Sequence, residues 1–259
     1  MGTISKLGVV LASVAIWQSL FHFLNFWLSE KIFPWFNVLS FEKKRDWNSR
    51  VVCTCHALVI LVLYVCSFVF DKILTVDPNG GHLSLLNVII PISAGYVISA
   101  LLTLIFCWRA IGDTISVIVL CVALYIYYLM LTERVRANIE SFRLLRLLST
   151  PFVNQQYFFD ILEYPKFSEA YIINGAFMTV MFFLLRIAVI PVFYYFVYCV
   201  YGTGNDVNLG FLVQWSWISS FVVIDIINII WMIKIIKTMK LKFLIQGEKA
   251  TRCLHEKFD

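Results

Sequence analysis

The chain consists of long apolar segments separated by short polar connections. Each apolar segment has roughly the 20 residues that a transmembrane α-helix needs. Turn residues occupy the connections at 77–81 and 202–206, and Pro91 and Pro191 lie inside apolar segments, where membrane helices tolerate kinks. The pattern predicts spans at residues 7–28, 51–70, 83–108, 114–131, 170–201 and 209–233.

A further stretch, residues 136–164, is mixed in character. Arg136, Glu140, Arg143 and Arg146 recur at helical spacing among leucine and phenylalanine residues, and Pro151 follows them. This pattern is typical of an amphipathic helix that lies in the membrane interface. It is equally compatible with a broken span that enters the bundle.

The distribution of basic residues favours a span. With seven spans and an N-terminus outside the cytosol, the cytosolic segments hold 14 basic residues and the opposite side holds 4. Six spans with a cytosolic N-terminus give 14 against 6, but the basic cluster between Lys31 and Arg50 then falls outside the cytosol. We therefore predict seven transmembrane helices, a lumenal or extracellular N-terminus and a cytosolic C-terminus. The last helix is predicted to continue into the cytosol with four lysines that act as a topology anchor or contact anionic lipid: Lys234, Lys237, Lys240 and Lys242.

Composition excludes the soluble and the disordered classes. The chain is 61% hydrophobic and 14% charged, with a mean hydropathy of +0.83, against roughly 45–50% apolar and 25% charged in globular domains. The net charge of +5 is explained by topology and does not indicate a nucleic-acid partner. Residues 7–28 exceed the apolar core of a signal peptide and lack a small-x-small cleavage site, which predicts a retained helix.

The seven cysteines include no CxxC pair and predict packing residues. Cys53, Cys55 and His56 lie close together, but the neighbouring sequence offers no fourth ligand, so no metal site is predicted.

Polar groups inside apolar segments are the candidate functional residues, because an ionisable group at membrane depth costs about 2.5–3.5 kcal/mol on insertion scales. They are His22, Asn25, His56, Asn174, Arg186, Asp225 and Asn228.

Arg186 precedes Tyr201 by 15 residues and Asp225 follows Gly210 by 15, so an antiparallel hairpin places both at one depth. We predict an ion pair between them, with Asn228 one turn from Asp225 on the same face. The pair would fix helix register, or would form a lipid head-group or proton site. His56 would be a packing residue or a base, which needs an orienting partner.

Several motifs resemble a known family. The stretch from Glu42 to Val52, followed by Cys55-His56-Ala57, is similar to the start of the TLC domain, which ceramide synthases and translocon-associated membrane proteins share. Further similar stretches follow in order at residues 95–99, 111–113, 149–155, 164–168 and 231–234. The resemblance implies an endoplasmic-reticulum-type membrane, lipid handling, and six helices that form a barrel around a lipid cavity, preceded by one extra helix. In ceramide synthases the domain transfers an acyl chain from a coenzyme A thioester to an amine.

The chain departs from this family at its polar centre. Where the family pattern has an acidic residue, this chain has Ala100. In place of the family's adjacent histidines it has Val119 and Leu120, and in place of a glutamate it has Leu147. Acyl transfer needs a base and groups that stabilise an oxyanion, and these apolar side chains supply neither. The polar candidates that remain for a lipid cavity are His56, Ser99, Ser149, Asn154, Arg186, Asp225 and Asn228.

These observations predict a catalytically inactive membrane protein that binds lipids or regulates lipid composition, without a cofactor. Acyl chains or sphingolipid-like molecules are the expected ligands. One alternative is a lipid acyltransferase that uses acyl-coenzyme A and the residual polar residues; another is a structural partner of other membrane proteins. The predicted units are an N-terminal helix and loop at 1–40, a TLC-like domain at 41–240 and a cytosolic basic tail at 241–259.

Overall fold

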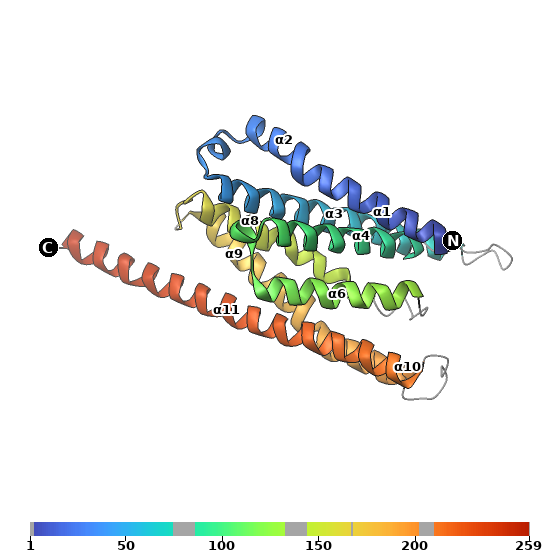
Figure 1. Ribbon diagram of the computed structural model, residues 1–259. Coiled ribbons are helices and arrows are strands. Elements are labelled where there is room, and N and C mark those ends of the chain that lie inside the picture. Colours follow the sequence, from blue (N-terminus) through green and yellow to red (C-terminus); the bar gives the residue numbers. More distant parts are fainter. Residues whose placement is uncertain (1–2, 75–85, 133–143, 167, 202–209, 259) are drawn as a thin grey trace.

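The computed structural model describes residues 3–74, 86–132, 144–166, 168–201 and 210–258, and most of these are helical (Figure 1). Within them, six helical segments are long and apolar enough to cross a membrane: Ile4–Phe23, Phe41–Ser67, Val88–Phe106, Thr114–Thr132, Glu169–Cys199 and Phe211–Lys240. The chain is an all-α polytopic membrane protein, and the six predicted apolar spans are confirmed. The predicted turns at 77–81 and 202–206 lie outside the described residues.

Successive long helices run in opposite directions, and the two chain ends lie at opposite ends of the bundle (Figure 1). The elements in order are α1 (Thr3–Ser19), the π-helical turn η1 (Leu20–Leu24), α2 (Asn25–Ile32), the 3₁₀ turn η2 (Pro34–Val38), α3 (Phe41–Leu74), α4 (Leu86–Phe106), α5 (Trp108–Ile111), α6 (Thr114–Thr132), the 3₁₀ turn η3 (Leu145–Ser149), α8 (Thr150–Ile161), α9 (Glu169–Phe182), the π-helical turn η4 (Phe183–Ile187), α10 (Val189–Tyr201) and α11 (Phe211–Phe258). Helix α11 continues without a break past Lys240, as predicted for the last helix.

The described part of the mixed stretch at 136–164 packs into the bundle. On α8, the Asn154 amide donates hydrogen bonds to the Arg50 carbonyl (3.1 Å) and the Thr54 hydroxyl (2.8 Å) of α3. On the other side, the Asn174 amide of α9 donates to the Phe152 carbonyl (3.1 Å). Further along α8, Tyr157 bonds to Asp46 of α3 and Asp160 accepts from Tyr171 of α9, so residue numbers rise on α8 as they fall on each neighbour and α8 is antiparallel to both. The element is therefore a partner of α3 and α9 inside the bundle, whereas the count of seven crossings and the barrel stay predictions.

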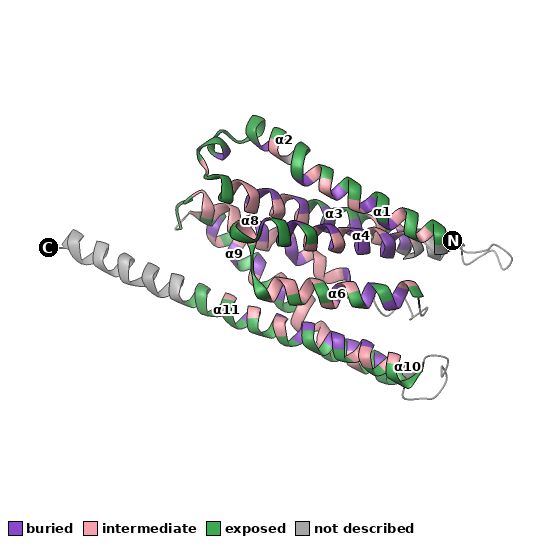
Figure 2. Ribbon diagram, viewed as in Figure 1, coloured by how far each residue is buried: buried purple, intermediate pink, exposed green. Residues whose placement is uncertain are grey.

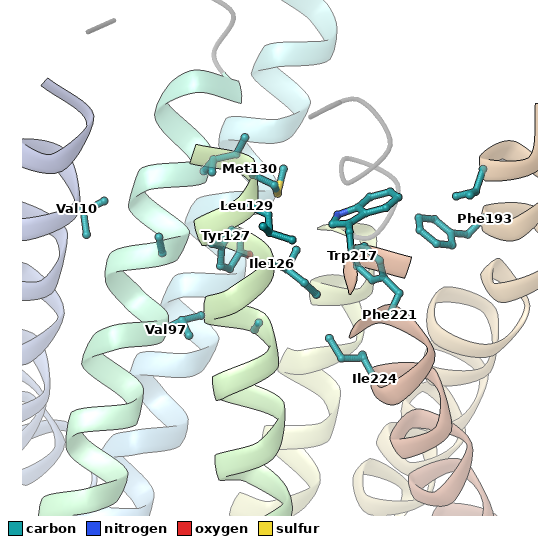
Figure 3. Packing of buried hydrophobic residues seen from close by; sticks show 14 residues of the cluster. Val10, Val97, Ile126, Tyr127, Leu129, Met130, Phe193, Trp217, Phe221 and Ile224 are labelled. Carbon is teal, nitrogen blue, oxygen red and sulfur yellow. The ribbon is translucent and has the colours of Figure 1, made fainter. Parts of the chain in front are cut away.

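The main hydrophobic core joins α1, α4, α6, α10 and α11 (Figure 3). Trp217 and Phe221 on α11 are buried, and both lie close to the Phe193 ring of α10. The outer faces of the same helices are exposed and apolar (Figure 2): Phe106 on α4 is 81% exposed and Tyr195 on α10 is 70% exposed. A bilayer is the solvent that such a surface needs, because lipid chains are as apolar as the side chains themselves.

Helices α1 and α4 are parallel neighbours in very close contact. The Ser13 hydroxyl of α1 donates a hydrogen bond to the Ile92 carbonyl (2.8 Å), and Gln18 Nε2 donates one to the Ser99 carbonyl (2.9 Å). Gly95 lies between these contacts, where an added Cβ atom would be 2.5 Å from the Ser13 Cβ and 2.7 Å from the Val10 carbonyl oxygen. Small residues permit such an approach between membrane helices.

Asp113 caps the first turn of α6. Its carboxylate accepts hydrogen bonds from the Ser116 hydroxyl (2.8 Å), the Ser116 backbone N–H (3.0 Å) and the Ile115 backbone N–H (3.4 Å). The hydrogen bonds from Ser116 hold the pKa of the Asp113 carboxyl below its usual value. The sequence thus begins this span with an acceptor for N–H groups that have no partner inside the helix.

Replacement of Asp113 by alanine is expected to lower the free energy of unfolding by about 1 kcal/mol at pH 7. Because the pKa is lowered in the folded protein, the carboxylate stabilises the fold above its ordinary pKa of 3.8, and this contribution is lost as the pH falls below that value. Unfolding in mixed micelles at pH 7 and pH 3, followed by helical circular dichroism, measures both effects. Asp113→Asn is the matched control, since its cap is independent of pH; an equal pH response in Asp113→Asn would contradict the assignment.

Candidate functional site

A polar cluster surrounds Arg186 in the middle of the bundle. The Arg186 guanidinium donates hydrogen bonds to the hydroxyls of Ser149 (2.8 Å) and Thr150 (3.4 Å) and to Asn228 Oδ1 (3.3 Å). It also lies 4.8 Å from the centre of the Phe182 ring, a cation–π distance. Side chains from the η3–α8 junction, from η4 and from α11 therefore converge on one cation.

Arg186 lies on a π-helical turn. The Ala188 N–H bonds to the Phe183 carbonyl, five residues earlier (2.9 Å), where a regular α-helix would use the Leu184 carbonyl. Pro191 follows this turn and has no backbone N–H to donate to the Ile187 carbonyl. Single π-helical turns occur frequently at functional sites.

Asp225 lies in the same cluster without forming the expected ion pair. Arg186, Asp225 and Asn228 line one pocket, which confirms that the hairpin brings the three side chains together. Between the described side chains of Arg186 and Asp225, however, there is no ion pair, so the predicted direct pair is wrong. The Asp225 carboxylate accepts a hydrogen bond from the Tyr194 hydroxyl (3.0 Å), and Arg186 turns its donors to neutral acceptors. Tyr194 lies eight residues after Arg186, just over two helical turns, which was a usable signal in the sequence.

The pocket in this cluster is small and two-sided. Its volume is about 10 Å³, close to the minimum for one water molecule. Arg146, Arg186, Asp225 and Asn228 form its polar side, and Leu185, Val189 and Ile190 form its apolar side.

His56 lies in a different environment, between α1, α3 and α4. Its ring stacks on Tyr96 with centroids 3.7 Å apart and an interplanar angle of 7°, and it meets the edge of Trp17 at 5.5 Å. The imidazole is buried, and its Nε2 atom has no hydrogen-bond partner among the described residues. The aromatic contacts assign His56 a packing role, while the unpartnered nitrogen is a polar atom that a ligand could reach only if the helices moved.

A second polar connection holds α8 to the start of α3. The Asp46 carboxylate accepts hydrogen bonds from Arg50 Nε (3.1 Å) and from the Tyr157 hydroxyl, and the Arg50 guanidinium lies 3.7 Å from the Tyr157 ring centre. Asn154 lies three residues before Tyr157 on α8 and also bonds to α3. Its role here is to join the two helices.

Of the four positions at which the resemblance implies polar residues, two pack against apolar clusters. Leu120 packs against the main core, and Leu147 packs against a second cluster of Ile60, Ile89 and Leu144. Ala100 and Val119 are partly buried on α4 and α6. Acid–base chemistry at these positions therefore has no titratable side chain to use.

The remaining candidates occupy separate places. Ser99 is buried at the α1–α4 contact, and the Asn174 amide donates to Gln156 Oε1 (3.0 Å) between α9 and α8. His22 is exposed on η1, and the side chain of Asn25 lies outside the described part. The sequence candidates thus divide into the Arg186 cluster, the His56 aromatic stack and several helix contacts.

A larger pocket of about 920 Å³ lies along the first span. Its lining residues come from α1, η1 and α2: Ala15, Ile16, Ser19, Leu20, His22, Phe23, Phe26, Trp27 and Glu30. The volume is in the range of small-molecule sites. This apolar groove belongs to the helix that the resemblance placed before the barrel.

Comparison with known proteins agrees with the motifs. The TLC domain family matches residues 46–237 of the chain. The chain is 49% identical to TLC domain-containing protein 4 of Homo sapiens over 249 residues, which are 96% of this chain and 95% of the relative. The chain belongs to the TLC domain family. It is also 41% identical over 239 residues to TLC domain-containing protein 4-B of Xenopus laevis, covering 92% of this chain and 91% of the relative, and 37% identical over 257 residues to its namesake of Danio rerio, covering 97% of each. No solved structure matches the chain.

The TLC domain match begins at Asp46, inside α3, and ends at Lys237, inside α11. It therefore includes the Arg186 cluster, His56 and the four apolar positions. It leaves out α1, although Trp17 of α1 forms part of the His56 environment.

Proposed function

We propose that this TLC domain protein binds membrane lipids or regulates the lipid composition of an endoplasmic-reticulum membrane, and that it does not catalyse acyl transfer. The observation that carries the proposal is the apolar packing of Leu120 and Leu147 at positions where the resembling family has polar groups. General acid–base catalysis contributes about 10²–10⁴-fold in enzymes that have such groups. With Ala100 and Val119 also apolar, these four positions lack this contribution.

Two features support a lipid ligand. The groove on α1, η1 and α2 combines aromatic and aliphatic residues with Ser19 and Glu30, as an amphiphile requires. The pocket at Arg186 likewise has one polar and one apolar side. The groove, with both kinds of lining residue, offers a lipid contacts for its head group and for its chain.

The unpartnered Nε2 of His56 favours a second candidate, a lipid acyltransferase in which His56 acts as the base. A base with a free nitrogen can take a proton from a nucleophile. Its aromatic neighbours Trp17 and Tyr96 argue against this candidate. A catalytic base needs a hydrogen-bonding partner, such as a carboxylate, to orient its imidazole, and these ring contacts do not supply one.

The test uses the full chain purified in mild detergent. We expect mass spectrometry to find lipid that co-purifies with the protein. We also expect no release of coenzyme A from a long-chain acyl-coenzyme A in the presence of an amine acceptor, for the unchanged chain and for His56→Ala alike. Release above that of heat-denatured protein, abolished by His56→Ala, would establish the acyltransferase. Protein that is stable without any bound lipid would contradict the lipid-binding proposal.

A further inference from the structure

The stretch Phe33–Phe41, between the first two spans, carries no charged residue. It holds four aromatic residues, and the nearest charged residues lie on its flanks, at 30–31 before it and at 42–43 after it. A connection that lies in water ordinarily consists of polar and turn residues. The composition of this stretch therefore indicates surroundings that are less polar than water.

The segment is fixed to the bundle through Phe36, in the 3₁₀ turn η2. The Phe36 side chain is fully buried, and its ring centre lies 5.8 Å from that of Phe26 and 6.1 Å from that of Trp47. Trp47 of α3 packs in turn against Phe158 of α8, with ring centres 4.3 Å apart. The Leu39 N–H donates a hydrogen bond to the Phe36 carbonyl (3.2 Å). The segment thus has one orientation relative to α3 and α8.

The neighbouring side chains are apolar and exposed (Figure 2). Trp35 is 71% exposed, Val38 is 82% exposed and Phe41 is 62% exposed. Trp27 and Ile32 of α2 are exposed as well, so the apolar outer surface of α2 continues into the segment. A fixed apolar surface of this kind marks contact with a membrane or with a partner.

The place of the segment in the fold favours the membrane. It connects the spans Ile4–Phe23 and Phe41–Ser67, and the connection lies at one end of the bundle (Figure 1). Val38 precedes Phe41 by three residues, so chain length alone keeps it within about 11 Å of the start of that span. The head groups extend about 5–8 Å beyond each face of the hydrocarbon core. Tryptophan and tyrosine are the residues enriched at this depth.

Two lysines next to the segment suit the same position. The Lys31 Nζ atom lies 4.1 Å from the centre of the Trp27 ring, and the Lys44 Nζ atom lies 5.1 Å from the centre of the Phe36 ring. Lysine buries its aliphatic stem along apolar surface while its ammonium group stays in polar surroundings. Lipid head groups supply such surroundings directly above the chains.

We propose that residues 33–41 form an interfacial anchor in the leaflet where the first two spans meet. Trp35, Val38 and Phe41 insert between the head groups and the first part of the lipid chains, and Phe36 holds the anchor to the bundle. Its partner is the lipid surface itself. The inference therefore goes beyond the proposed function and depends neither on a bound lipid ligand nor on the absence of catalysis.

The test locates Trp35 relative to lipid and water. The full chain and its Trp35→Phe variant are placed in vesicles of phosphatidylcholine that carries bromine, a short-range quencher of tryptophan fluorescence, near the head group or near the chain end. The difference between the two proteins reports Trp35. We expect strong quenching by bromine near the head group and weak quenching by bromine near the chain end, which corresponds to a depth of about 5–10 Å. Iodide in the water should quench this difference signal weakly.

Trp217→Phe is the matched control, because Trp217 is buried and its difference signal should respond to neither quencher. A photoreactive benzoylphenylalanine in place of Val38 gives a second reading that does not require Trp35→Phe to fold. On illumination it should form adducts with the mass of phosphatidylcholine. The same probe in place of Phe106, which is exposed on α4, should also form them.

Three outcomes would overturn the proposal. Quenching of the Trp35 signal by iodide and by neither brominated lipid would place the segment in water. Quenching only by bromine near the chain end would place it in the membrane centre. Covalent dimers of the chain from the probe at Val38, without lipid adducts, would assign the surface to a second copy. None of these readings involves the groove or Arg186, so a chain that co-purifies without lipid would contradict the proposed function alone.

Discussion

Replacement of Trp217 by alanine is expected to lower the free energy of unfolding by about 3–5 kcal/mol. Trp217 is 1% exposed and lies against Phe193 and Phe221, so it joins α10 and α11 to the main core (Figure 3). The truncation leaves a cavity inside the protein, where lipid chains cannot replace the lost contacts. Equilibrium unfolding in mixed micelles, followed by helical circular dichroism, measures the loss.

Trp215→Ala is the matched control, because it removes the same side chain from the same helix. Trp215 is 57% exposed and contacts Phe211 within its own helix. We expect a loss below about 1 kcal/mol, as is usual for surface substitutions. Equal losses for the two variants would show that the α10–α11 contact does not form as described.

Gly95→Leu is expected to have the second largest effect, a loss of about 3 kcal/mol, at the upper end of the range for overpacking. Even the first added carbon would be 2.7 Å from the Val10 carbonyl oxygen, a backbone atom that a side-chain rotation cannot move away. Helices α1 and α4 would have to separate, with loss of the hydrogen bond from Ser13 to Ile92. A lowered melting temperature of the purified chain reports the change.

Gly8→Leu provides the comparison for this substitution. Gly8 also lies in α1, but nothing is within 4 Å of an added Cβ atom there. The variant should keep the melting temperature of the unchanged chain, because the new side chain points to open space in the apolar outer region. If Gly95→Leu were equally harmless, the close α1–α4 approach would be wrong.

The spans could be predicted from the sequence because their signal is local. Twenty apolar residues that must satisfy their own backbone hydrogen bonds leave little choice except a helix. The depth of Arg186 and Asp225 was predictable for the same reason, since both are counted from one short connection. The partners of these two side chains were not predictable from the sequence. Arg186 lies on a π-helical turn, Phe183–Ile187, and its guanidinium donates to the hydroxyls of Ser149 and Thr150, which come from a distant segment.

The environment of His56 was beyond sequence reasoning for a related cause. Trp17 and Tyr96 come from helices that precede and follow α3, and no periodicity along α3 reports them. The stretch at 136–164 was ambiguous because it mixes charged and apolar residues at helical spacing. Its described part was assigned to the bundle by Asn154, whose amide finds acceptors on α3 only after both helices have packed.

The parallel contact of α1 with α4 also has a consequence for biosynthesis. The Ser13 hydroxyl and the Ile92 carbonyl are 79 residues apart in the chain, so the first helix enters the membrane well before its main partner has been translated. Such contacts between distant residues form late in folding. The α1–α4 contact therefore extends the packed bundle to a helix that lies before the family match, which begins at residue 46.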